Sequence, residues 1–491
     1  MDLGLRTASS EHGASRLDLP KGLAAVTLRP RLGCRARAAA ARVLPAPAPV
    51  GVTLGAPASD NHIVVTPRPR VVVVGAGFGG LAAVRGLAGA PVDVTVVDQD
   101  NYHGFWPLLY QVASSELAPE DIAAPIRAMM SGRSDVEVRL GTVEQVDLDG
   151  RRVCLAGGTE LRFDYLIVAG GTVTSDFGIP GVSAHAYTLK TLPDAVRLRN
   201  HVLRAFERAD ALAAGSGTPP SRPVTVVVAG GGSTGVEMAG ALAELIRHNL
   251  AGDFRHLDLS RARVVLVEMT DHLLPGFSLK SQAAAATLHR LGVDVRLSTS
   301  IATVEPDGVT VTPRGGGAPE RIEADTVVWT AGVRANPLGA CLAGDLKWGG
   351  RVPVEADLTL PGHPEVFVVG DMAAATDRHG QPLPQVAQVA IQGGRHAARC
   401  IARRLGGRPT RRFRYHDHGS MATIGRRSAV AELPGGLVVT GTAGWLAWLG
   451  VHLVFLVGFR KRALVLATWA WNYITWDRAS RVIMETRDRS A

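Results

Sequence analysis

Residues 71–83, VVVVGAGFGGLAA, decide the fold of this chain. The four consecutive valines are typical of a parallel strand buried on both faces, and the glycine-rich turn after them leads into a helix. Residues 92–98, VDVTVVD, predict a second strand that ends in an acid. Together they form a strand–helix–strand unit with the spacing of a dinucleotide-binding site, whose candidate residues are Gly75, Gly77, Gly79, Gly80 and Asp98.

The same unit occurs a second time. Residues 224–240, VTVVVAGGGSTGVEMAG, repeat the strand, turn and helix, and residues 262–268, ARVVLVE, repeat the second strand and its terminal acid. One such glycine pattern is weak support for a nucleotide site, whereas two patterns in the same context are strong support. The second set of candidate residues is Gly230, Gly232, Gly235, Glu237 and Glu268.

Three further buried strands close the two units. Residues 163–171 and 326–332 each run into glycines, and residues 366–371, VFVVGD, end in Gly-Asp. This order predicts an α/β chain with two Rossmann-like domains, the second inserted into the first. The predicted parts are a leader (1–69), the first domain in two pieces (70–190 and 336–410), the second domain (191–335) and a C-terminal helical region (411–491).

Composition excludes several classes of protein. The four cysteines are far apart in the sequence, so they predict neither a disulfide framework nor a metal site. The formal net charge is +9, but no basic face with interleaved aromatic residues is evident, and we expect no nucleic-acid partner. Basic residues at the two ends favour a membrane surface or an unstructured leader. The Arg- and Ala-rich leader resembles a transit peptide, and it also fits a bacterial start site placed too early.

The fingerprint residues have distinct physical roles. Their glycines let backbone amides approach a pyrophosphate at the positive end of the following helix. We expect Asp98 and Glu268 to accept hydrogen bonds from ribose hydroxyls, although each is also explained as a solvated strand end. Glu268 would repel a 2′-phosphate, and Met269 and Thr270 after it cannot bind one, so this site favours NADH over NADPH.

Three polar side chains follow the last predicted strand. Asp371 would lie near the middle of the first dinucleotide and accept hydrogen bonds from a ribityl chain, which only a flavin nucleotide has; the alternative is a helix N-cap. Gln388 and Gln392 are four residues apart, so their amides project from one helix face. Neutral amides suit the carbonyl oxygens of a flavin or a quinone, and the alternative is a solvated face.

The C-terminal region is apolar in two short stretches. Residues 445–459 and 463–476 contain five of the eight tryptophans and are separated by residues 460–462, Arg-Lys-Arg. Neither stretch is long enough to cross a hydrocarbon core of about 30 Å. We therefore expect a helix pair that lies in the membrane interface, with the basic cluster at anionic headgroups. A dimerisation hairpin, a core helix pair and a re-entrant hairpin stay open.

The chain resembles the type II NADH dehydrogenases, single-subunit NADH:quinone oxidoreductases that do not pump protons. The likeness runs from Arg70 to about Ile483, and its last segments are absent from most other flavoproteins with two dinucleotide sites. The segments that carry it are 101–103, 107–113, 119–123, 189–191, 230–240, 329–333, 387–392, 419–425, 452–453 and 458–460.

This resemblance implies FAD in the first site, NADH in the second, and a quinone that is reached from the membrane side beside Gln388 and Gln392. It also implies that Glu237 is the acid near the nicotinamide side of the flavin. Glu237, Gln388 and Gln392 are thus the catalytic candidates, and no metal is required. The expected location is the cytoplasmic face of the cell membrane, or the inner mitochondrial membrane if the leader is a transit peptide.

Three departures from the family pattern and two rival functions remain. Gly104 and Trp106 stand where the family usually has a larger apolar residue and Gln, and Gly170 replaces a usual Thr. A sulfide:quinone oxidoreductase would need cysteines near the flavin, and only Cys341 is suggestive. An NADH-sensing flavoprotein that changes its assembly is the second rival. The sequence also leaves open whether the protein forms a homodimer.

Overall fold

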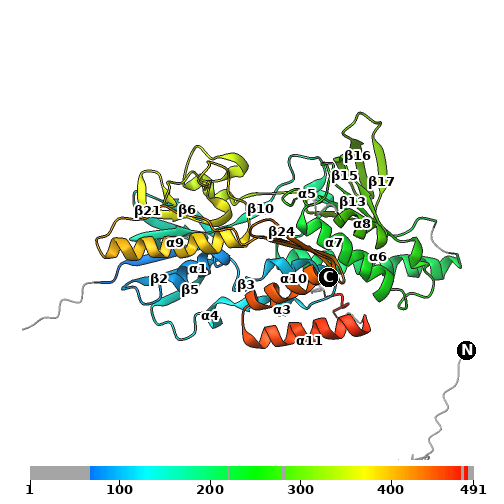
Figure 1. Ribbon diagram of the computed structural model, residues 1–491, viewed down its shortest axis with the longest axis horizontal. Coiled ribbons are helices and arrows are strands. Elements are labelled where there is room, and N and C mark those ends of the chain that lie inside the picture. Colours follow the sequence, from blue (N-terminus) through cyan, green and yellow to red (C-terminus); the bar gives the residue numbers. More distant parts are fainter. Residues whose placement is uncertain (1–66, 219–220, 279–282, 477–479, 485–491) are drawn as a thin grey trace, which may run out of the picture. The chain divides into compact units, whose positions relative to one another are not determined.

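The computed structural model describes residues 67–218, 221–278, 283–476 and 480–484 (Figure 1). The first fingerprint lies in a six-stranded sheet in which β1, β2, β5, β9 and β21 run parallel and β20 is antiparallel. In spatial order its strands are β20 (Thr359–Leu360), β21 (His363–Val368), β9 (Tyr165–Val168), β1 (Arg70–Val74), β2 (Asp93–Asp98) and β5 (Val136–Leu140).

The second fingerprint lies in a five-stranded, wholly parallel sheet. Its strands are β11 (Tyr187–Thr188), β18 (Thr326–Trp329), β12 (Thr225–Ala229), β13 (Arg263–Val267) and β14 (Val293–Arg296). The order β18-β12-β13-β14 repeats the order β9-β1-β2-β5 of the first sheet. The repeat seen in the sequence is therefore a repeat of topology.

Side chains alternate across the second sheet, as a strand requires. Val226 and Val228 face the core that contains α7 (Ser233–Glu244), whereas Val227 and Ala229 face a core shared with an antiparallel three-stranded sheet. That sheet consists of β15 (Thr299–Glu305), β16 (Gly308–Pro313) and β17 (Glu320–Glu323). The long helix α6 (Leu192–Ser216) and α8 (Ala283–Arg290) complete this half.

In the first half, α1 (Phe78–Gly86) packs along α9 (Ala387–Leu405) beside the six-stranded sheet. A small sheet borders it, formed by β6 (Val143–Asp147), β7 (Arg152–Leu155) and β8 (Glu160–Arg162). The remaining short elements are β3 (Tyr102–Gly104), β4 (Ala123–Pro125), α2 (Leu109–Ala113), α3 (Pro119–Ile122), α4 (Ile126–Met129) and α5 (Val182–His185).

Two antiparallel strands connect the halves. The chain leaves the first sheet through β10 (Thr172–Thr174) and returns through β19 (Val333–Ala335), which pair with each other. The crossing lies earlier than the expected boundary at residue 190, because β11 already pairs with β18 of the second sheet. This arrangement places the second half between β9 and β21 in chain order.

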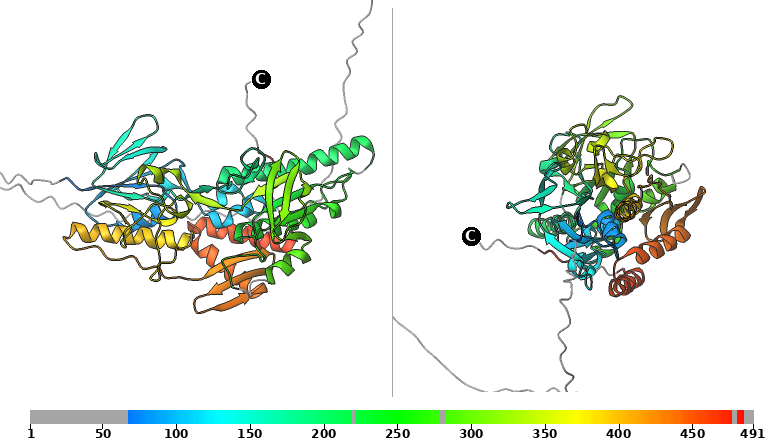
Figure 2. Two further views of the ribbon diagram at one scale, coloured as in Figure 1. Left: turned by 90° about the horizontal axis from the view of Figure 1, so that it is seen from above. Right: turned by 90° about the vertical axis from the view of Figure 1, so that its left-hand side faces the viewer.

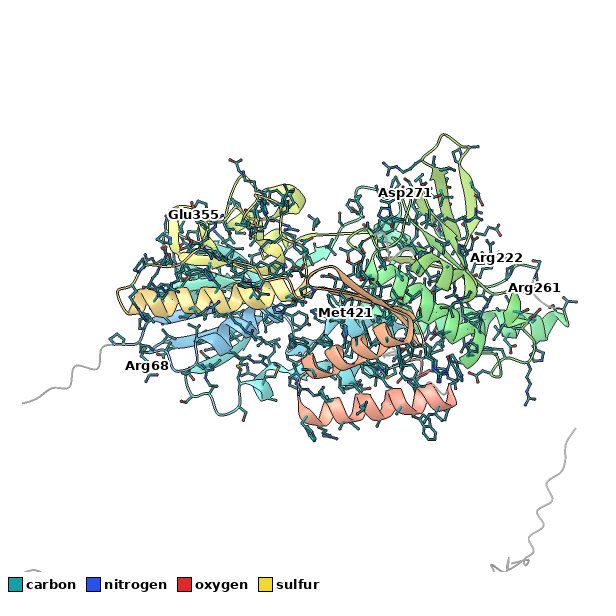
Figure 3. The ribbon with its side chains drawn as sticks, in the orientation of Figure 1. Arg68, Arg222, Arg261, Asp271, Glu355 and Met421 are labelled. Atoms are coloured by element: carbon teal, nitrogen blue, oxygen red, sulfur yellow. The ribbon has the colours of Figure 1, made fainter. Side chains whose placement is uncertain are left out.

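The C-terminal region adds a three-stranded sheet and two helices. The sheet consists of β22 (Ser420–Gly425), β23 (Ser428–Leu433) and β24 (Leu437–Thr440), and Figure 3 shows Met421 of β22 between the two halves. Helices α10 (Gly441–Phe455) and α11 (Phe459–Thr475) bury Trp448 and Trp469 in the core that also holds α2 and α7. Within the described ranges, no helix is long and apolar enough to span a membrane.

Candidate functional site

In the first glycine-rich turn, backbone segments lie closer together than a residue with a side chain would allow. Gly75 has a φ of +94°, and a Cβ on it would lie 2.5 Å from the carbonyl oxygen of Ala169, just after β9. A Cβ on Gly80 would lie 1.8 Å from the oxygen of Gly75 itself. Gly77 differs, because a Cβ there meets nothing within 4 Å. Its missing side chain leaves open space at the start of α1, which is the space that a pyrophosphate needs.

The second turn repeats this geometry. Gly230 has a φ of +102°, and its Cβ would lie 2.6 Å from the Cα of Ala331, just after β18. The Cβ of Gly235 would again lie 1.8 Å from the oxygen of the first glycine, and that of Gly232 would meet nothing within 4 Å. Both turns therefore fit a dinucleotide phosphate at the same relative position.

The two strand-end acids are bound to the turns beside them. The amide of Ala76 donates to Asp98 Oδ2 at 2.5 Å, and the amide of Gly231 donates to Glu268 Oε2 at 2.5 Å. Each acid also accepts an amide two residues further along the chain. A carboxylate has about four acceptor positions, so capacity for ribose hydroxyls remains. Burial raises the pKa of Asp98, and the amide of Ala76 opposes that shift.

Asp371 lies in a charged cluster at the carboxyl ends of β9 and β21. Lys190 Nζ donates to Thr172 Oγ1 at 2.5 Å, and Arg351 nearby is buried and donates to the carbonyl of Leu383 at 2.9 Å. Burial raises the pKa of Asp371, while Lys190, Arg351 and Thr172 lower it. Residues 373–386 form no helix, so the alternative interpretation of Asp371 as a helix N-cap is wrong. An acid stabilised by two nearby cations suits the polar middle of a dinucleotide.

Gln388 and Gln392 have different partners. Gln388 Nε2 donates to the carbonyl of Gly419 at 3.3 Å, and its Oε1 is buried with no partner in the described part of the chain. A ligand N–H or O–H would satisfy that oxygen. Gln392 uses both ends of its amide on His416, donating to its carbonyl at 2.8 Å and accepting from its amide at 3.0 Å. The expectation that both amides face one ligand is therefore wrong for Gln392, which fastens the chain after α9.

Glu237 starts a series of hydrogen bonds that ends in a C-terminal helix. The amide of Thr423 donates to Glu237 Oε1 at 3.3 Å, and the hydroxyls of Thr423 and Tyr110 are 3.1 Å apart. Gln111 Nε2 donates to the hydroxyl of Tyr110 at 3.1 Å. Trp469 Nε1 of α11 donates to Gln111 Oε1 at 2.9 Å. The helix of the second fingerprint is thus linked through polar contacts to α11.

A narrow pocket opens beside Glu237. Burial raises the pKa of Glu237 to about 8, so its carboxyl is protonated at neutral pH. Aromatic side chains of α10 and α11 and of the residue that follows α11 close the opposite wall: Trp445, Trp469, Tyr473 and Trp476. The acid that the sequence singled out therefore faces an aromatic-lined space.

Comparison with known proteins decides the family. Residues 69–394 match the pyridine nucleotide-disulphide oxidoreductase family, and residues 417–475 match the NDH2 C-terminal domain. The type II NADH:quinone oxidoreductase Ndh of Mycobacterium tuberculosis is 42% identical over 431 residues, which cover 85% of this chain and 91% of that protein. NdhA of the same organism is 40% identical over 439 residues, covering 87% and 92%. The chain belongs to the type II NADH:quinone oxidoreductase family. The resemblance drawn from the sequence motifs is confirmed.

Solved structures show the same fold. NDH2 from Plasmodium falciparum in complex with NADH superposes with a TM-score of 0.75 at 18% identity, covering 85% of this chain and 100% of that one. The sulfide:quinone oxidoreductase of Aquifex aeolicus reaches 0.64 at 18% identity, covering 80% and 92%. The predicted α/β architecture with paired dinucleotide-binding domains is confirmed.

The structure explains two departures from the family pattern. A Cβ on Gly104 would lie 2.3 Å from the ring of Trp106, so the glycine provides the space that the indole occupies. A Cβ on Gly170 would lie 2.9 Å from the sulfur of Met372, which fills the place of the usual Thr side chain. Each substitution in this member of the family is matched by a neighbouring side chain.

Several site residues escaped the sequence analysis. Tyr110 and Gln111 lie in the segment 107–113, and Lys190 lies in the segment 189–191, both of which carried the resemblance. The motif gave these residues no chemical role. Thr172 and Arg351 carried no local signal, because only the folded chain brings them to the site. Trp469 belongs to the apolar C-terminal stretch that the sequence singled out, but nothing in the sequence linked it to Gln111.

Proposed function

We propose that this chain oxidises NADH and reduces a membrane quinone through bound FAD. When bound, FAD supplies the two-electron chemistry, taking a hydride from NADH and passing electrons to the quinone. The observation that supports this most directly is the pair of fingerprints, each with an open central glycine and its own acid, within one fold. A protein with a single nucleotide site would not need the second turn.

The residues divide between the two ligands. The turn at Gly77 with Asp98 and the Asp371 cluster holds FAD, and the turn at Gly232 with Glu268 holds NADH. Hydride transfer needs close approach and alignment rather than a strong acid or base, so both turns act mainly by positioning. Glu237 holds a proton on its carboxyl at neutral pH beside the aromatic-lined pocket. Gln388 Oε1 supplies an unused acceptor.

Helices α10 and α11 attach the chain peripherally to the membrane. Their outward residues are strongly exposed, with Val454 at 64%, Phe459 at 86% and Ile474 at 80%. Such a row of large apolar side chains suits a helix pair that lies in the interface. We assign it to the cytoplasmic face, where NADH is available, rather than to a contact with a second copy. The leader, and with it the transit-peptide interpretation, lies outside the described residues.

The decisive test of the reaction uses purified full-length protein. We expect NADH, but not sulfide, to bleach the flavin absorbance, and a soluble menaquinone or ubiquinone analogue to sustain NADH oxidation. Bleaching by sulfide would indicate a sulfide:quinone oxidoreductase. The cysteines do not favour that activity, because Cys341 contacts the carbonyl of Glu144 in β6 and Cys400 lies against His396 in α9. NADH binding without turnover, with a change of assembly, would indicate a sensing protein.

Membrane attachment needs a separate test. Deleting the chain from residue 445 would remove the buried Trp448 and Trp469, so it would damage the core. The variant Phe459→Ser/Ile474→Ser instead removes only exposed apolar area. We expect it to lose binding to neutral phosphatidylcholine vesicles and keep NADH oxidation in detergent. If the variant changes from dimer to monomer in detergent and still binds vesicles, the helices serve dimerisation instead.

A further inference from the structure

The excess positive charge of this chain equals that of one internal segment. Residues 378–416 contain nine arginines and no lysine, aspartate or glutamate. The rest of the chain has 44 basic and 44 acidic residues, so it is formally neutral. The expectation that basic residues gather mainly at the chain ends is therefore wrong.

This segment forms a groove. Helix α9 presents Arg395, Arg399 and Arg403 at intervals of four residues, so they share one face. The connector after α9, residues 406–418, folds back along this face. The groove between them is open to solvent, and its lining residues include no acid.

Contacts at both ends fix the groove in place. Gln392 and His416 form the reciprocal pair described above, and Arg403 Nε donates to the carbonyl of Pro409 at 2.7 Å. Between them, Phe413 packs edge-on against the buried His396, with ring centroids 5.3 Å apart. Apart from Arg403, the arginine side chains along the groove take no part in the contacts that hold its walls.

Most of these guanidinium groups have no partner among the residues that the structure describes. Six exposed side chains make neither a hydrogen bond nor an ion pair within the ranges that the structure describes: Arg395, Arg399, Arg408, Arg411, Arg412 and Arg414. Two acids close to this segment have partners other than these arginines. Asp357 pairs with Arg404 at 3.7 Å, and Asp417 accepts the amide of Gly419 at 2.9 Å. Repulsion among like charges therefore remains until an anion enters the groove.

The groove adjoins the C-terminal helices. Gln388 binds Gly419, the residue before β22, and α10 packs on β23. Figures 1 and 2 show one end of α9 close to the β22–β24 sheet, with α10 and α11 next to that sheet. A basic groove next to an exposed apolar helix pair has the arrangement of a surface that meets headgroups and acyl chains together.

We propose that the groove between α9 and residues 406–418 binds the phosphate headgroups of anionic lipids and forms a second membrane contact. This proposal rests on the peripheral membrane attachment proposed above, and it adds a charge-selective contact to the apolar contact of α10 and α11. Arginine suits this role because its planar guanidinium binds phosphate oxygens in pairs.

The test measures partition of full-length protein onto vesicles. The groove variant is Arg399→Gln/Arg411→Gln/Arg414→Gln, and the matched control is Arg162→Gln/Arg208→Gln/Arg255→Gln, which removes three exposed arginines away from α9. Vesicles contain phosphatidylcholine alone or with about one third phosphatidylglycerol, at ~0.15 M salt. We expect about a fivefold loss per groove arginine on anionic vesicles, so about a hundredfold in the variant. On neutral vesicles the variant should bind as the unmodified protein does.

Each other outcome overturns the proposal. An equal loss in the control variant would mean that only net charge matters, and no loss in the groove variant would mean that lipid does not enter. Inorganic triphosphate that binds the unmodified protein but not the groove variant, with vesicle binding unchanged, would make the groove a site for a soluble anion. NADH oxidation in detergent, expected to be equal in all three proteins, reports separately on the proposed reaction. If the unmodified protein did not bind neutral vesicles, that result would refute the proposed apolar anchor instead.

Discussion

The two fingerprints have the same turn but different surroundings. Both third glycines approach the first glycine's carbonyl equally closely, and both acids accept a turn amide at 2.5 Å. Around the first turn, however, α9 comes so close that a Cβ on Gly394 would lie 2.0 Å from the oxygen of Gly79. The corresponding residue in the second turn is Thr234, which is exposed.

We propose that this difference distinguishes a cofactor retained at the first turn from a substrate exchanged at the second. Helix α9 packs against the helix that follows the first turn, and we expect a nucleotide bound there to leave slowly. The second turn has an exposed side at Thr234, and we expect a nucleotide there to enter and leave in each cycle. Glu237 marks the same asymmetry, because the equivalent position two residues after the third glycine is Ala82 in the first unit. We expect both turns to bind phosphate, and the neighbouring elements to determine how long the ligand stays.

The largest expected effect comes from the third glycines. Gly80→Ala and Gly235→Ala each place a Cβ 1.8 Å from a backbone oxygen, so the turn must shift. We expect Gly80→Ala to be purified without flavin. Gly235→Ala should keep flavin, while its kcat/KM for NADH falls about 100-fold, since such overpacking costs up to about 3 kcal/mol. Flavin absorbance and steady-state rates measure both effects.

The matched control is Gly215→Ala in α6, where a Cβ meets nothing within 4 Å. It should leave both ligands unaffected. If Gly80→Ala retained flavin while Gly235→Ala lost it, the assignment of the two sites would be reversed.

The strand-end acids should give the next largest effect. Hydrogen bonds to a charged group contribute about 1.5–3 kcal/mol, so Glu268→Ala should raise the KM for NADH roughly 10- to 100-fold. Asp98→Ala should instead lose flavin on dialysis, with little change in KM for the fraction that retains it. Asp93→Ala, an exposed acid at the start of β2, is the control. An unchanged KM in Glu268→Ala would mean that the acid only holds its own turn.

The sequence predicted the order of elements because that order is written in local patterns. Valine runs, glycine turns and strand-end acids each depend on residues close in the chain, and all of them recur in the structure. The partners of Glu237 could not be found this way, since Thr423 and Trp469 reach it only through the shared core. Gln392 shows a different limit of sequence analysis. Its four-residue spacing from Gln388 was predicted correctly, but spacing alone does not predict that the backbone of His416 binds the Gln392 side-chain amide.

The third prediction uses the acid that only the second unit has. The pKa of Glu237 is raised to about 8 from 4.5, so its protonated form is favoured by folding. The corresponding stability is full below about pH 4.5 and is lost as pH rises through about 8. We expect wild-type stability to fall over this window relative to Glu237→Gln, which cannot ionise. NADH oxidation should likewise decline above pH 8 in the wild type only. Parallel pH profiles for the two proteins would show that Glu237 ionises at an ordinary pH.

The smallest expected effect tests whether Gly104 and Trp106, the two departures from the family pattern near the first site, compensate for each other. Gly104→Ala places a Cβ 2.3 Å from the Trp106 ring, and overpacking of this kind costs about 1–3 kcal/mol. The single variant should melt a few degrees lower, at roughly 2–4 °C per kcal/mol in a domain of about 200 residues, and its flavin band should shift.

The double variant Gly104→Ala/Trp106→Gln restores the usual family residue at position 106 and removes the clash, so it should recover most of that loss. The coupling between the two substitutions, measured with Trp106→Gln alone as the fourth corner of the cycle, should be favourable. If the losses of stability in the two single variants were simply additive, the departures at positions 104 and 106 would be independent. Gly104 would then provide space for the bound ligand rather than for the Trp106 indole.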